Sequence, residues 1–439
     1  MNHTIQTYLQ EDIQRIQKLS LDIFHCAELA ENEVKSAQLM ADYLREHNFQ
    51  VELGIGGMPT SIRGIWGSGT PCIGFLGEYD ALPQLDQPPQ PYYCGNPEKN
   101  GHGCGHNLLG VGSAAAAVAL TKALAAGHLS GTIIYYGCPA EEILKGKVTM
   151  ISHGCFTELD TALSWHPGME NNCGELSYLA IDSIQFFFQG KSAHASAAPH
   201  KGRSALDACE LMNVGVNYLR EHVPENVRMH YSYLLGDMAP NIVPAQAGVW
   251  YFIRGQKRET VDDVMGRVLD IARGAALMTS TEVTWKFLSR GYDTLVNMSM
   301  CGLIHRVMTE LGAPEFTKDE KDFIQALGAQ ISSESDVLMD ETIAPLTGAV
   351  TYMTGSTDIS DVSQLIPTGY FRAACGPKGS ALHTWQYTAC AGHAVGERGM
   401  AFAAQVLAET GLELIANPDA IKNVKKEFQQ KSKGYSALV

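Results

Sequence analysis

The stretch SIQFFFQG (residues 183–190) decides the fold, because it opens a run of alternating strand and helix patterns that ends near residue 294. Behind this apolar strand, the sequence predicts a helix at 204–223, strands at 228–236 and 247–255, a helix at 259–279 and a strand at 282–291. The resulting β-α-β-β-α-β order is typical of the ferredoxin-like arrangement. We therefore predict a small complete unit over residues 182–294.

A different pattern surrounds this unit. Helical periodicity at 5–29 and 34–47 alternates with short apolar strands at 71–80 and 131–142, and helices return at 300–312 and 398–416. The run LLGVGSAAAAVALTKALAAG (108–127) predicts a helix, starting near Asn107, that packs closely against a sheet. The fold class is therefore α/β: a discontinuous larger domain, 1–181 and 295–439, into which the ferredoxin-like domain 182–294 is inserted.

Composition restricts the partners. The chain has 439 residues, 45% of them hydrophobic, and a formal net charge of −15, which argues against a nucleic-acid partner. No apolar stretch approaches the roughly 20 residues that span a bilayer, and the N-terminal residues lack the features of a signal peptide. Eleven scattered cysteines indicate reduced thiols rather than a disulfide scaffold. We expect a cytoplasmic protein without a membrane partner.

Potential metal ligands follow the predicted strands. They stand in GHGCGHNLLG (101–110), CPAEE (138–142), SWHPG (164–168) and LHTW (382–385). Each alone has an ordinary explanation, because a lone cysteine packs as a small apolar residue and a lone histidine is usually a hydrogen-bonded structural residue. Together they supply the thiolate, imidazole and carboxylate donors of a divalent metal site.

Glu141 and Glu142 suggest a division of labour. Adjacent residues of an extended segment point to opposite sides, so the two carboxylates do not easily chelate one ion together. One can bind metal while the other takes a proton from water, as in metal-assisted hydrolysis. The alternative is a solvated loop pair. In GHGCGHN the glycines permit the sharp turn that aims Cys104 and His106 at one place.

Nine motifs, in order along nearly the whole chain, carry a resemblance. They are LGEYDALP, GHGCGHNLLG, GCPAEE, WHPG, GKSAHAS, GRSALDA, PNIVPAQAGVWYFIRG, STDISDVS and LHTWQ. The chain resembles the dinuclear metallopeptidase family of aminoacylases and carboxypeptidase G, within it the amidohydrolase branch with a cysteine in the metal site. The resemblance implies a metallopeptidase catalytic domain with an inserted domain that acts as lid and mediates dimerisation.

The resemblance also implies the site residues. Two divalent ions, manganese as the first expectation and zinc as the second, are implied on the ligands Cys104, His106, Glu142, His166 and His383. Glu141 matches the general base, and Asp80 matches the acidic residue that orients a ligand. From the inserted domain, His194 matches the histidine that polarises the scissile carbonyl, and Asn241 and Arg254 match residues that hold the substrate carboxylate.

One departure concerns Glu78, which stands where many members have a histidine two residues before the strand-end aspartate. It leaves the metal identity open. The implied function is hydrolysis of the amide bond of N-acyl or N-aroyl amino acids, such as aminobenzoyl-glutamate or indoleacetyl-aspartate, by a homodimer or by a heterodimer of two related subunits. Alternatives are a dipeptidase for β-alanyl or similar dipeptides, a metal-binding regulatory relative, and a nucleotide binder. The glycine groups GIGG and GVGSA lack the full dinucleotide fingerprint.

Overall fold

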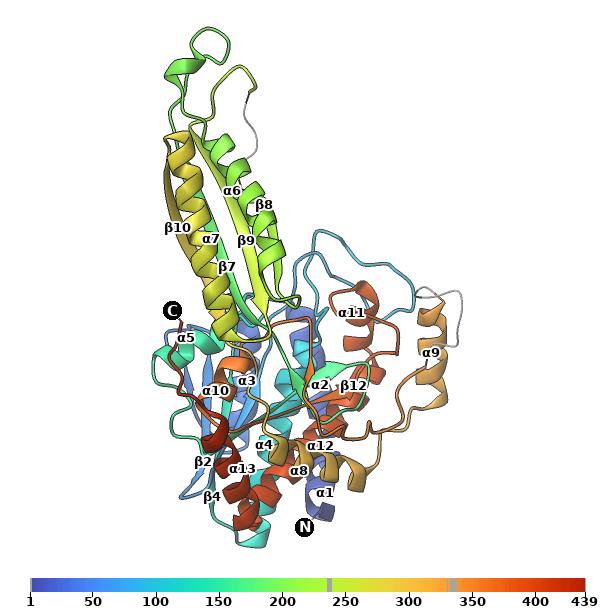
Figure 1. Cartoon of the computed structure of the whole chain (residues 1–439). Helices are drawn as coiled ribbons and strands as arrows, with labels where there is room; N and C mark the ends of the chain where they lie inside the picture. Colours follow the sequence, from blue (N-terminus) through green and yellow to red (C-terminus); the bar gives the residue numbers. More distant parts are fainter. Residues whose placement is uncertain (1, 235–238, 330, 332–337, 439) are drawn as a thin grey trace. The chain divides into compact units, whose positions relative to one another are not determined.

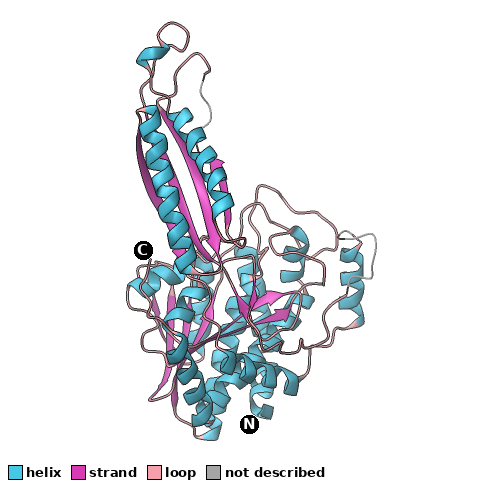
Figure 2. Cartoon of the chain, in the orientation of Figure 1, coloured by secondary structure: helices cyan, strands magenta, loops and turns pink. Residues whose placement is uncertain are grey.

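The structure is a computed structural model that describes residues 2–234, 239–329, 331 and 338–438. It divides into two compact units. The first, here the α/β unit, comprises Met1–Leu176, Leu295–Thr351 and Asp361–Ala437; the second, here the inserted unit, comprises Ser177–Thr294, Tyr352–Ser360 and Leu438–Val439. Figures 1 and 2 show their helices and strands.

The inserted unit has the element order expected from the sequence. Strands and helices follow as β7 (Ala180–Gln189), α6 (Ala205–Leu219), β8 (Arg228–Tyr233), β9 (Gln246–Gly255), α7 (Arg258–Thr279) and β10 (Glu282–Gly291). The sheet is antiparallel with the order β10-β7-β9-β8. Alternate strand residues such as Ile184, Phe186 and Tyr251 are buried with apolar residues of both helices, so both helices cover one face (Figure 2). Residues 235 and 236 of the expected third segment lie outside the described residues.

The segment 352–360 belongs to the inserted unit, although the sequence boundaries put it with the larger domain. Hydrogen bonds join it to the residues just before β7: Met353 N donates to Ser177 O and Leu179 N donates to Gly355 O, both at 2.9 Å. These bonds connect residues far apart in sequence, and a local pattern does not reveal such pairing. The first boundary also lies a few residues earlier than the expected 181/182.

The α/β unit contains a mixed sheet of order β1-β2-β4-β3-β5-β12. Its strands are β1 (Gln50–Leu53), β2 (Ile62–Ser68), β3 (Cys72–Gly77), β4 (Gly131–Gly137), β5 (Thr161–Gly168) and β12 (Thr368–Ala374). The last four run parallel, while β1 and β2 are antiparallel to their neighbours. Because β3, β4, β5 and β12 are parallel, their carboxyl ends share one edge of the sheet. The short strands β6 (Leu176–Ser177) and β11 (Thr351–Tyr352) pair with each other.

Helices surround this sheet. They are α1 (Asn2–Glu11), α2 (Ile13–Cys26), α3 (Val34–Glu46), α4 (His106–Gly127), α5 (Gly146–Ser152), α8 (Met298–Leu311), α9 (Lys318–Gly328), α10 (Ile359–Leu365), α11 (Trp385–Ala391), α12 (Ala394–Ala416) and α13 (Pro418–Lys431). The continuous helix expected at 5–29 is instead two helices that break at Asp12, whose side chain accepts a hydrogen bond from Tyr43 Oη at 2.9 Å. The helical period continues across this break, so periodicity alone missed it.

Helices α4 and α12 pack on each other and on the parallel strands as the centre of the core. Both are long and apolar enough to cross a membrane by length and composition, so the expectation that no such segment exists is wrong on that criterion. In the folded chain, 89% of the most apolar window of α4 and 72% of that of α12 are buried. Small residues along α4 permit this packing, as the sequence predicts.

Two glycines bring the start of α4 to the sheet edge. Gly105, immediately before the helix, has φ of 74°, which favours glycine. A Cβ on Gly110 would lie 2.4 Å from the carbonyl oxygen of Glu78, so only glycine allows this close approach. The first turn of α4 therefore lies directly beside the residues that follow β3.

Candidate metal centre and active site

The expected ligands of the α/β unit meet at the carboxyl edge of its parallel strands. Asp80 follows β3, Glu141 and Glu142 follow β4, and His166 lies in β5. His106 is the first residue of α4, with Cys104 just before it, and His383 follows β12. Three overlapping groups each have their donor atoms within 4.8 Å of one another. They are Cys104, His106 and His166; Cys104, Glu142 and His383; and Glu78, His106 and Glu141. Shared members join the groups into one cluster.

Asp80 organises the centre of this cluster. His106 Nδ1 donates to Asp80 Oδ1 at 2.9 Å, and the backbone N–H of Glu142 donates to Asp80 Oδ2 at the same distance. In the neutral imidazole, the proton on Nδ1 leaves His106 Nε2 with a lone pair that can bind a metal. Both Asp80 oxygens therefore accept hydrogen bonds from two other candidate ligands, His106 and Glu142.

The other candidate ligands approach one another at similar spacings. Cys104 Sγ lies 3.4 Å from His166 Nε2, and His383 Nε2 lies 3.5 Å from Glu142 Oε2. His166 Nδ1 is 2.6 Å from the carbonyl oxygen of Pro167, to which it donates, so its Nε2 faces the thiol as an acceptor. His383 is about half exposed, whereas His106 is fully buried. The cluster thus opens to solvent at His383.

Burial and neighbouring groups shift several pKa values in the cluster. Burial alone would lower the pKa of His106, but Cys104 and Asp80 outweigh it and raise that pKa. Burial raises the pKa of Glu142 to about 7 and also raises the pKa of the Cys104 thiol. Burial alone would raise the pKa of Asp80, but the hydrogen bond and charge of His106 outweigh it and lower that pKa. For His166, burial lowers the pKa and His106 lowers it further, which favours the neutral, metal-binding imidazole.

Two loops hold left-handed backbone at non-glycine residues beside the site. Ala140, directly before Glu141, has φ of 58°, and its N–H donates to Glu33 Oε1 at 2.8 Å. His383 has φ of 62°, and its N–H donates to Gly103 O at 2.8 Å. Such backbone is disfavoured for residues with a Cβ and persists where surrounding contacts fix it. Sequence reasoning missed Glu33, because nothing local in AENEV marks it as a support for a distant loop.

The buried ion pair of Lys147 and Glu78 was also not predicted from the sequence. Lys147, fully buried in α5, donates from Nζ to Glu78 Oε1 at 2.6 Å. The other oxygen, Glu78 Oε2, lies 3.3 Å from His106 Nε2. The sequence marked Glu78 only as a departure from the family pattern, and GKVTM gives no local sign that its lysine is buried.

The candidate residues of the inserted unit lie in two places. Asn241 and His194 are brought together, because Ala195 N donates to Asn241 O at 2.9 Å and His194 forms a β-bridge with Ile242. The Nδ1 atom of His194 accepts from the N–H of Ala197 at 3.2 Å, which leaves Nε2–H as a donor. Its side chain is exposed.

Arg254 lies at the opposite end of the same sheet. The strand from Gln246 to Arg254 spans about 26 Å at roughly 3.3 Å per residue, so one chain does not bring Arg254 and Asn241 to one small molecule. Arg254 Nη1 donates to Thr354 O at 3.4 Å, while its buried Nε has no hydrogen-bond partner among the described residues. This arginine therefore retains an unused donor.

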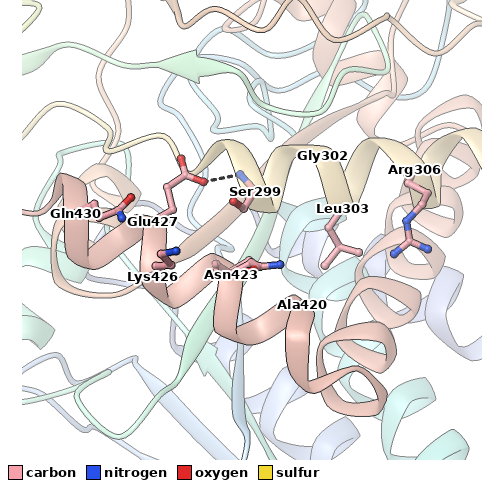
Figure 3. Close-up of a pocket in the computed structure, with 10 residues that line it drawn as sticks. Ser299, Gly302, Leu303, Arg306, Ala420, Asn423, Lys426, Glu427 and Gln430 are labelled. Atoms are coloured by element: carbon pink, nitrogen blue, oxygen red, sulfur yellow. Dashed lines mark hydrogen bonds between the residues drawn. The ribbon is translucent and has the colours of Figure 1, made fainter.

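A separate pocket of about 590 Å³ lies between α8 and α13. Figure 3 shows Leu303 and Arg306 on one wall and Asn423 and Lys426 on the other, with Glu427 accepting from the N–H of Ser299. The described residues that line it include no histidine or cysteine. The cluster at the sheet edge, rather than this pocket, contains the side chains that could bind a metal ion.

The residues of the cluster fit a divalent metal. Three of its atoms, Glu78 Oε2, His106 Nε2 and Glu142 Oε1, are buried without a hydrogen-bond partner in the described part of the chain. Buried polar atoms without partners are costly, and a cation that accepts their lone pairs removes this cost. Thiolate, imidazole and carboxylate donors together suit borderline metals such as zinc and manganese.

Comparisons with known proteins agree with this architecture. The model of Peptidase family M20/M25/M40 matches residues 74–409. The chain is 34% identical to a p-aminobenzoyl-glutamate hydrolase subunit of Escherichia coli (97% of this chain, 94% of the relative) and 31% identical to Xaa-Arg dipeptidase of Mus musculus (85% and 79%). A dinuclear metal binding peptidase from the M20 family of Bacillus subtilis shares the fold, with a TM-score of 0.63, 15% identity and coverage of 93% and 99%. The chain belongs to peptidase family M20/M25/M40.

Proposed function

We propose that this protein hydrolyses the amide bond of N-acyl or N-aroyl amino acids with the help of two divalent metal ions. The observation that carries the proposal is the cluster at the sheet edge, in which a thiol, imidazoles and two adjacent carboxylates lie within a few ångströms. The Escherichia coli relative, similar over nearly the full length and named for p-aminobenzoyl-glutamate hydrolase, supports an aroyl amino acid as substrate.

Five residues would hold the metal ions: Cys104, His106, Glu142, His166 and His383. Bound divalent cations polarise a substrate carbonyl and make water a better nucleophile at neutral pH. Manganese remains the first proposal, as the family resemblance implies. Zinc is the second, because the thiol of Cys104 favours zinc on softness. Bound ions would also offset the negative charge of the buried carboxylates of the cluster.

Glu141 acts as the general base. Its carboxylate takes a proton from water as the water oxygen attacks the amide carbon, and it then gives this proton to the amine nitrogen as the C–N bond breaks. The products are a carboxylic acid and an amino acid. Its neighbour Glu142, whose backbone N–H donates to Asp80, would hold metal, so we assign the two carboxylates separate tasks.

The functional protein is a dimer in which each site takes residues from both chains. The reason is the separation along β9: Arg254 and the His194–Asn241 pair lie at opposite ends of one sheet. We propose that the partner chain supplies Asn241 and also His194, whose Nε2–H donates to the carbonyl oxygen, while Arg254 serves its own chain. A homodimer is the simplest form, and a heterodimer with a related subunit is the alternative.

The surface of the inserted unit supports such pairing. Helix α6 exposes Leu211, Val214 and Tyr218 along one side, the last with 76% of its surface accessible. Strand β8 is an edge of its sheet and exposes Tyr231 and Tyr233. Asn213 of α6 donates to Tyr233 Oη at 3.1 Å, so helix and strand form one surface. An exposed apolar stripe beside an unpaired strand edge is typical of an association surface.

A substrate panel tests the proposed function. The purified protein, loaded with Mn²⁺ or with Zn²⁺, is expected to release the amine from aminobenzoyl-glutamate or indoleacetyl-aspartate, and chelation is expected to abolish this activity. Dipeptides with a β-alanyl residue or a C-terminal arginine form the second arm, because one relative is named Xaa-Arg dipeptidase. Faster cleavage of the dipeptides would replace the acyl amino acid assignment, and no cleavage of any amide would refute the enzyme.

Recognition of the substrate carboxylate by Arg254 is tested by substitution. Loss of a charge-assisted hydrogen bond costs about 1.5–3 kcal/mol, so Arg254→Ala should lower kcat/KM by roughly ten- to a hundred-fold. For an analogue whose carboxylate is converted to an amide, the same substitution should lower kcat/KM much less. Arg228, paired with Arg254 on the neighbouring strand and exposed, provides the control Arg228→Ala, which should behave as the wild type. Equal losses on both substrates would assign Arg254 to folding or association instead.

A further inference from the structure

Glu78 and Lys147 form a buried ion pair that the proposed reaction does not use. Both side chains are almost completely inaccessible, at 3% and 0% relative exposure. Burying two charges costs free energy that a single contact only partly recovers, and a fully buried lysine is rare. The pair lies beside the metal cluster and not in the apolar core, which suggests a role at the metal site.

The geometry splits the two oxygens of Glu78 between two tasks. Oε1 accepts from Lys147 Nζ at 2.6 Å. Oε2 is buried, has no hydrogen-bond partner among the described residues, and lies 3.3 Å from His106 Nε2. That nitrogen also lacks a hydrogen-bond partner within the same part of the chain. The two atoms therefore face one another at ion-pair distance with no hydrogen bond between them.

The spacing is that of two ligands on one cation. Donor atoms bound to one ion at about 2.0–2.2 Å lie about 3.0–3.5 Å apart in tetrahedral or octahedral geometry. The Glu78–His106 distance falls in this range, as do the 3.4 Å from Cys104 Sγ to His166 Nε2 and the 3.5 Å from His383 Nε2 to Glu142 Oε2. The distance between the donor atoms of Glu78 and His106 is thus similar to the distances between the expected ligands.

We propose that Glu78 is a further metal ligand, which shares an ion with His106, and that Lys147 is a positioning residue that fixes the free oxygen of Glu78 toward that ion. The inference rests on the proposed metal-dependent function and adds to its ligand set. Lys147 holds one carboxylate oxygen, which leaves a single oxygen for the metal. Its positive charge also offsets part of the negative charge gathered by Glu78, Asp80, Glu141 and Glu142.

The test measures metal binding rather than turnover. The variants are Glu78→Gln, Lys147→Met and the double variant. The control is Lys145→Met, because Lys145 lies two residues before Lys147 and pairs with exposed Glu31. Stoichiometry after dialysis against Mn²⁺ is read by mass spectrometry, and affinity by calorimetry. Glu78→Gln and the double variant are expected to bind one ion about 10- to 100-fold more weakly. Lys147→Met is expected to lower the affinity for the same ion. The control should match the wild type.

The double variant separates a ligand from a structural pair. Glu78→Gln alone leaves a buried lysine uncompensated and lowers stability for that reason, whereas the double variant removes both charges. A folded double variant that still binds one ion weakly supports the proposal. A folded double variant with two ions at wild-type affinity overturns it, and if the double variant does not fold, the same comparison applies to Glu78→Gln. Failure of the wild type to bind any divalent ion would instead overturn the proposed function itself.

Discussion

Glu141→Gln is expected to lower kcat by about 10²- to 10⁴-fold, since the amide cannot accept the proton of the attacking water. The substitution keeps the size of the side chain, which is buried beside the cluster. Metal content should stay at the wild-type level, because the five proposed ligands are unchanged. Single-turnover kinetics together with metal analysis on the same preparation check both statements.

The neighbouring residue supplies the control. Glu142→Gln removes a proposed ligand and should lose both activity and metal. Glu141 Oε2 lies 3.9 Å from His106 Nε2, within the group that also holds Glu78. Loss of metal from Glu141→Gln would therefore show that Glu141 is a ligand, and near-normal activity would show that it is not the base.

His194→Ala is expected to lower kcat by about 10²- to 10³-fold, as for removal of one donor to a developing oxyanion. If His194 acts on the partner's site, mixing this variant with Glu141→Gln restores activity. Random exchange of a 1:1 mixture makes half of the dimers hybrid, each with one intact site, so about a quarter of wild-type activity should return. Activity of the mixture over time, after each variant is assayed alone, measures this.

A second mixture makes the test directional. Arg254 is proposed to serve its own chain, so Arg254→Ala mixed with Glu141→Gln should restore nothing on carboxylate substrates. Asn241→Ala mixed with Glu141→Gln should behave as the His194 mixture does. Two affinity tags establish that hybrids form. Hybrids without restored activity in the His194 mixture would place His194 in its own chain's site.

Much of the fold follows from local patterns. Alternation in SIQFFFQG and AGVWYFIRG predicts strands whose buried residues face two helices, and the structure has that order and that burial. The alanine-rich α4 begins one residue before the expected start near Asn107. These elements were predictable because each buries one face or stripe, and the period of the apolar residues records it.

The site was only partly predictable. The ligands proposed from the sequence in the α/β unit lie together, because they follow strands whose carboxyl ends share one edge. Glu33, Glu78 and Lys147 were missed as contributors, since their contacts depend on chain segments that meet only in three dimensions. Similarly, no local pattern reveals that β9 separates Asn241 from Arg254, or that 352–360 bonds to the residues just before β7.

The α/β unit is built from chain on both sides of the inserted unit, and this order has a consequence for biosynthesis. Strand β12 pairs with β5, and His383 completes a group that begins with Cys104. On the ribosome, His383 is made about two hundred residues after His166, roughly 10–40 s later at 5–20 residues per second. During that interval the nascent chain exposes the free edge of β5 and an incomplete set of donors. With the proposed ligand set, full metal loading would therefore be a late event, and cells grown with scarce metal should accumulate full-length apo-protein that ions added after lysis can activate.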